Sequence, residues 1–194
     1  MYNNKSVVQK VKSSLWNRVA LGAMLIGMSM SSQAGLIGLD LEDSPDIYSE
    51  FIAVSYNAGL DEFSATGTAS QLVNVAGQPG LAITDGVFDL SALISDTGMI
   101  SGSLSITGTI ASLGFNSGSL LTGSLTQVGF DENVASTSDD LLEFLFTVTD
   151  GDASDLFGSL GGVILKFSSF SGWDNDFSSG TQANPYVAQS DTGV

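Results

Sequence analysis

The chain has 194 residues with no cysteine and no histidine, and its formal net charge is −16. It therefore cannot form a disulfide or a Ser-His-Asp or Cys-His catalytic group, and it lacks the main ligands of zinc sites. The acidic excess repels nucleic-acid phosphates, which excludes nucleic-acid binding as a function class.

Residues 1–34 are typical of a secretory signal peptide. They combine a basic beginning, an apolar run over residues 19–30, and small side chains at Ser32 and Ala34. An uncleaved membrane anchor is the alternative, but the apolar run has 12 residues, and about 20 are needed to span a bilayer. We therefore expect cleavage after Ala34 and export.

The charge becomes more negative once the signal peptide is removed. All 21 acidic residues follow Ala34, and Lys166 is the only basic residue there, so the charge of the mature chain is 1 − 21 = −20. Without arginine, the mature chain also lacks the side chain best suited to clamp phosphates or carboxylates. The acidity indicates either solubility outside the cell or affinity for cations such as Ca²⁺.

Short runs of alternating apolar and polar residues predict half-buried strands through the mature chain. In residues 100–110, aliphatic side chains at 100, 104, 106 and 110 alternate with Ser and Thr. We expect strands, in chain order, at 51–56, 63–69, 88–94, 100–110, 142–148 and 163–167.

These strands predict an all-β fold, an antiparallel β-sandwich or barrel-like sheet with at most one short helix. The helical turn is expected within 153–160, capped by Asp152 or Ser154. Residues 35–177 are expected to form a single β-rich domain, and residues 178–194 a flexible C-terminal tail.

A near-repeat relates residues 101–115 to residues 117–130, which share Ser-Gly-Ser-Leu at the start and aliphatic-Gly-Phe at the end. Two copies are too few for a solenoid. We expect two neighbouring strands paired through a turn at Asn116-Ser-Gly118.

Acidic residues offer two kinds of candidate site. Asp89, Glu143 and Asp150 are candidates for the carboxylate pair of a glycosidase, although Glu143 is expected to be a solvated carboxylate on a polar face. Possible calcium ligands are Asp150, Asp152, Asp155, Asp174 and Asp176. The alternative for the first three is a turn followed by a helix cap.

Exposed aromatic side chains are candidates for glycan binding. Trp173, beside Asp174, Asn175 and Asp176, is the first choice, and further candidates are Tyr48, Tyr56 and Tyr186. The alternative is that these rings plug the open end of the β-domain.

Several segments share a Gly-, Ser- and Thr-rich pattern: residues 63–69, 86–92, 102–109, 120–123, 127–130 and 142–149. Together, over about residues 50–180, they resemble secreted bacterial proteins of the PEP-CTERM type. The resemblance implies export by a Gram-negative bacterium, of a group that often makes exopolysaccharide, and it assigns no residue a role. Pro-Glu-Pro, an apolar helix and an arginine cluster are not found after Tyr186, so processing by an exosortase is expected only if a sorting tail follows Val194.

Three functions are consistent with these observations. The first is an exported, non-catalytic structural or surface protein associated with the extracellular matrix, with exopolysaccharide or other envelope components as partners and signal peptidase acting during export. The second is a glycan- or calcium-binding adhesion module, and the third is a carboxylate-based glycosidase. We expect no enzyme activity and no cofactor, with calcium the one candidate.

Overall fold

The computed structural model describes residues 35–41, 44–74, 79–96, 98, 100–131, 140–167 and 181–193. All of them belong to one compact unit, Ser31–Val194; the other unit, Met1–Met30, and the rest of the predicted signal peptide lie outside the described residues. No helix in the described part of the chain is long and apolar enough to span a membrane.

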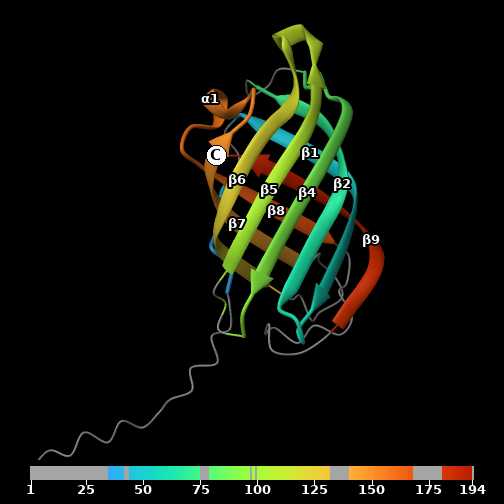
Figure 1. Cartoon of the computed structure of the whole chain (residues 1–194), viewed down its shortest axis with the longest axis vertical. Coiled ribbons are helices and arrows are strands. Elements are labelled where there is room, and N and C mark those ends of the chain that lie inside the picture. Colours follow the sequence, from blue (N-terminus) through green and yellow to red (C-terminus); the bar gives the residue numbers. More distant parts are fainter. Residues whose placement is uncertain are drawn as a thin grey trace, which may run out of the picture. The chain divides into compact units, whose positions relative to one another are not determined.

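The described residues form a closed antiparallel barrel (Figure 1). Around the barrel the strands follow the order β1-β9-β8-β7-β6-β5-β4-β2, and β2 pairs again with β1. The short strand β3 pairs with β2 outside this ring. The strands are β1 Asp46–Asn57, β2 Glu62–Val73, β3 Leu81–Ala82, β4 Thr84–Ile94, β5 Ile100–Ile110, β6 Phe115–Asp131, β7 Asp140–Asp150, β8 Leu160–Phe167 and β9 Thr181–Gly193. The predicted all-β, barrel-like fold is confirmed.

Apolar side chains at alternate positions along the strands fill the barrel interior. On β5, Leu104, Ile106 and Ile110 are buried, whereas the hydroxyl residues between them face outward. The rings of Phe63 on β2 and Phe144 on β7, which lie on opposite sides of the barrel, approach to 5.2 Å between centroids. Each such buried side chain stabilises the fold by about 1.5–3 kcal/mol.

The near-repeat does form two paired strands, β5 and β6, but the predicted turn is wrong. The turn is a 3₁₀ helix, η1 Ala111–Leu113, closed by Gly114 in the left-handed conformation (φ 74°). The amide of Gly114 donates to the carbonyl of Ala111 at 3.1 Å. Asn116-Ser-Gly118 lies inside β6, because Gly114 already reverses the chain.

The predicted helical turn is α1 Ser154–Phe157, but its predicted cap is wrong. Ala153 is the N-cap, and no side chain caps the helix. Backbone hydrogen bonds to β6 hold this segment instead: the amides of Asp152 and Ala153 donate to the carbonyls of Ser119 and Leu120, both at 2.9 Å.

The expected flexible tail over 178–194 is wrong for residues 181–193. They form β9, which pairs with β1 on one side and with β8 on the other. The strand was not expected because the segment is polar and contains Pro185. Its pairing uses backbone groups, which every sequence supplies except at proline.

Deleting residues 181–193 should therefore abolish cooperative unfolding, because it leaves β1 and β8 with unpaired edges and opens the interior to water. Thermal unfolding followed by circular dichroism measures this, with a chain shortened by Val194 alone as the control. A deleted protein that melts like the intact one would show that β9 is dispensable.

Candidate functional site

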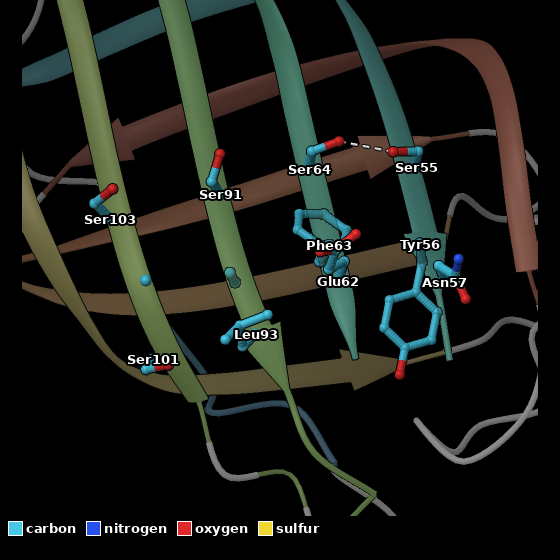
Figure 2. A pocket seen from close by; sticks show the side chains of 12 residues that line it. Ser55, Tyr56, Asn57, Glu62, Phe63, Ser64, Ser91, Leu93, Ser101 and Ser103 are labelled. Carbon is cyan, nitrogen blue, oxygen red and sulfur yellow. Dashed lines mark hydrogen bonds between the residues drawn. The ribbon is translucent and has the colours of Figure 1, made fainter. Parts of the chain in front are cut away.

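A groove with a volume of about 670 Å³ crosses β1, β2, β4 and β5 beside the β1–β2 turn (Figure 2). Two rows of side chains form its walls, and each row contains one residue from each of the four strands. The first row is Ser55, Ser64, Ser91 and Ser103, and the second is Asn57, Glu62, Leu93 and Ser101. The strand register alone places each row in line.

The residues between the two rows form the floor. Tyr56, Phe63 and Ala92 turn their side chains into the core, where they are almost fully buried. Their partner on β5 is Gly102, whose φ is 151° and at which a Cβ atom would lie 2.1 Å from the carbonyl oxygen of Ser91. Only glycine fits there without moving β4.

The first wall is a row of hydroxyl groups. Ser55 and Ser64 share a hydrogen bond of 2.7 Å between their Oγ atoms, drawn dashed in Figure 2. The Ser91 hydroxyl donates to Oδ1 of Asp89 at 3.3 Å. Since each hydroxyl has one donor and two acceptor positions, this wall keeps free hydrogen-bonding capacity for a ligand.

The second wall adds an acceptor and an apolar contact. Glu62 is exposed and Leu93 is 52% exposed. Asn57 is held in place, because its Oδ1 accepts a hydrogen bond of 3.0 Å from the amide of Gly59. Among the described residues the only cation is Lys166, on β8, so the groove offers no positive charge to an anionic ligand.

The candidate glycosidase carboxylates are not brought together. Asp89, Ser105, Thr122 and Asp150 lie in register on β4, β5, β6 and β7. Three strand spacings separate the two aspartates by about 14 Å, whereas the two carboxyl groups of a glycosidase lie at most about 9.5 Å apart.

Glu143 is buried, with 3% of its surface exposed, so the prediction of a solvated carboxylate is wrong. It does point away from the core, but the segment of residues 35–41, here called the strap, covers it. The carboxylate accepts hydrogen bonds from the amides of Gly38 at 2.7 Å and Leu39 at 3.2 Å. Gly38 has a φ of 81°, which lets both amides converge on one carboxylate.

Two glycines make room for the strap. A Cβ atom at Gly129 on β6 would lie 2.6 Å from the nitrogen of Ile37, and one at Gly162 on β8 would lie 2.8 Å from a methyl group of Leu39. The strap therefore lies close against the barrel wall, with Glu143 on β7 between these glycines. This geometry gives Glu143 a structural role.

Replacing Glu143 with Gln should lower the free energy of unfolding by about 1–3 kcal/mol, since it removes the charge that two backbone amides bind. Urea denaturation measures the change. The matched control is Glu62→Gln at an exposed site, which should stay within about 0.5 kcal/mol of the unchanged protein. Equal stabilities of the two variants would contradict the role of the strap contact.

The calcium candidates do not form a site in the described part of the chain. No three acidic side chains there are grouped so that they could hold a metal ion, and this includes Asp150, Asp152 and Asp155. Asp150 uses its Oδ1 to accept the amide of Gly151 at 2.8 Å, within the turn after β7. Asp174 and Asp176 lie outside the described residues.

The aromatic candidates for glycan binding have different outcomes. Tyr48 is 37% exposed, whereas Tyr56 is 2% exposed, so the prediction that Tyr56 is a surface platform is wrong. Its ring lies on the core side of β1, opposite Phe63. Trp173 and the side chain of Tyr186 lie outside the described residues.

Sequence reasoning did not single out Asn57, Glu62 or Leu93. One signal was available for Leu93. In residues 88–94 it is the only large apolar residue in the polar phase, which otherwise holds Asp89 and Ser91. The groove itself depends on the register of four strands, which no single segment reveals.

Comparison with known proteins identifies no family for this chain. No protein-family profile matches the chain, and no curated protein and no solved structure matches it significantly.

Proposed function

We propose that this chain is an exported, non-catalytic bacterial surface or matrix protein that binds neutral carbohydrate in the groove. The observation that carries the proposal is the pairing of a hydroxyl-lined wall with a wall that offers a carboxylate, an amide and an exposed Leu93. A sugar ring has the same mixed character, with hydroxyl groups at its edge and apolar C–H faces.

The chemistry of the groove favours hydroxyl-rich, uncharged ligands. Glu62 is an acceptor for sugar hydroxyls, and the serines can both donate and accept. The side chain of Leu93 can lose its water against a sugar face. A volume of about 670 Å³ lies within the usual range for small-ligand sites, about 300–1,000 Å³.

Binding without catalysis is the proposed activity. The mature chain has no histidine or cysteine to act as base or nucleophile. The carboxylates of Asp89 and Asp150 are too far apart for glycoside hydrolysis, and Glu143 is engaged with the strap. Calcium binding is the less favoured alternative, because no metal-binding group is found among the described residues.

Export is proposed from the signal-peptide pattern and from the resemblance to PEP-CTERM proteins. We expect the protein recovered from the culture medium to begin at Gly35, because Ser32 and Ala34 have the small side chains that signal peptidase accepts. Intact-mass spectrometry measures this directly. A secreted chain that retained residues 1–34 would contradict it.

Carbohydrate binding is tested by retention on amorphous cellulose, amorphous chitin, starch and mixed-linkage β-glucan. Leu93→Ala and Glu62→Gln should each weaken binding to the retained polysaccharide about tenfold, which corresponds to about 1.4 kcal/mol. The matched control is Leu160→Ala, because Leu160 on β8 is 53% exposed but lies outside the groove. No retention of the unchanged protein, or equal retention of all the variants, would contradict the proposal.

A further inference from the structure

Phe51 is the most exposed large hydrophobic side chain among the described residues, with 68% of its surface accessible. It lies on β1, where the pairing with β2 shifts between Glu50 and Ala53. Ile52, the next residue, is fully buried. The shift is a β-bulge that turns the Phe51 ring outward while the strand continues.

The backbone of Phe51 is strained. Its φ is 54°, in the left-handed region that bulky residues rarely adopt. A glycine at this position would form the same bulge without that cost. Neither the core nor the bulge requires an aromatic ring here. We therefore expect the ring to have a role on the outer surface of the barrel.

Strands β2 and β4 carry the side chains that lie across the sheet from Phe51. Thr68 pairs with Glu50, the residue before Phe51, and Gly67 pairs with Phe88, the residue after Val87. Val87 on β4 is 48% exposed. Asp85 is also exposed and has a φ of 51°, at the register shift of β4 between Thr84 and Val87.

The outer face of the barrel joins this region to the groove. On β4, Val87 and Leu93 face outward six residues apart, which is about 20 Å along the strand. Between them, the outward side chains on β2, β4 and β5 are Thr66, Ser64, Asp89, Ser91, Ser103 and Ser105. The face carries hydroxyl and carboxylate groups in the middle and an exposed apolar side chain at each end.

We propose that Phe51 is the stacking platform of a second carbohydrate subsite, so that the face binds an extended neutral polysaccharide from Leu93 to Phe51. This inference rests on the proposed function of the groove. The charge of −20 on the mature chain selects a neutral polymer over an anionic one, because like charges repel. Aromatic rings supply apolar contact area with little loss of conformational freedom.

The experiment compares disaccharides with hexasaccharides of the cello, chito and malto series by isothermal titration calorimetry on the intact protein. A disaccharide can fill only the groove, whereas a hexasaccharide can reach Phe51. Phe51→Gly should weaken hexasaccharide binding about tenfold and leave disaccharide binding unchanged. Phe51→Trp should retain the affinity for the hexasaccharide, and Leu160→Ala is the control for loss of an exposed apolar side chain.

Stability provides a second measurement on the same variants. Phe51→Gly should melt at the same temperature as the unchanged protein or higher, since glycine adopts the bulge conformation without strain. A lower melting temperature with unchanged affinity would show that the ring serves the fold, and it would overturn the subsite.

The outcomes separate the two proposals. Loss of hexasaccharide affinity in Leu93→Ala but not in Phe51→Gly overturns the second subsite and leaves the groove. Equal weakening of disaccharide and hexasaccharide by Phe51→Gly also overturns it. Loss in Phe51→Gly alone rejects the groove as the binding site and therefore also overturns the extended site from Leu93 to Phe51. No binding of any of these oligosaccharides by the unchanged protein overturns both.

Discussion

Strand β1 has neighbours on both edges, β2 and β9, and the rest of the structure depends on this closure. It removes the exposed edges of the sheet and turns one face of every strand toward a common interior. An eight-stranded barrel has an interior about as wide as its own side chains can fill, and the contact between Phe63 and Phe144 across it shows that filling. Because the core occupies the inward residues, the outward residues are free to vary for function.

The residues that depart from the regular alternation of inward apolar and outward polar side chains are therefore the candidates for function. Gly102 stands in the inward row of the floor without a side chain, which lets the carbonyl of Ser91 on β4 approach β5. Leu93 places an apolar side chain in a row that is otherwise polar. The bulge at Phe51 turns a large apolar ring out to solvent. Exposure of Leu93 and Phe51 is unnecessary for folding alone, and all three residues lie on strands that flank the groove, β1, β4 and β5.

The all-β fold class could be predicted from the sequence, because the alternation of apolar and polar residues in a strand can be seen within a short segment. The strand at 100–110 could be predicted with its bounds, since its inward residues are aliphatic except at Gly102 and Gly108. β9 could not, because Pro185 and its polar neighbours have no such period and the strand is held by partners far away in sequence. The same reason explains Glu143. Its partner Gly38 is 105 residues away in the sequence. The sequence around Glu143 therefore gives no sign that the strap buries its side chain. The groove needs four strands in register, which only the folded chain provides.

Charge and geometry act on a ligand at different distances. At physiological salt the field of the acidic surface extends about 8 Å, so it can repel an anionic polymer as it approaches but cannot distinguish one neutral sugar from another. That discrimination has to come from the outward rows, which repeat at about 4.8 Å across the strands and about 6.7 Å along them. Twist rotates each strand against the next by about 20–25°, so the hydroxyl rows form a curved lattice. A flexible or helically twisted polysaccharide could follow this curvature, whereas the flat face of a crystalline one would touch only one or two strands. For the proposed carbohydrate site, the barrel geometry thus favours a soluble or amorphous neutral chain over a crystalline one.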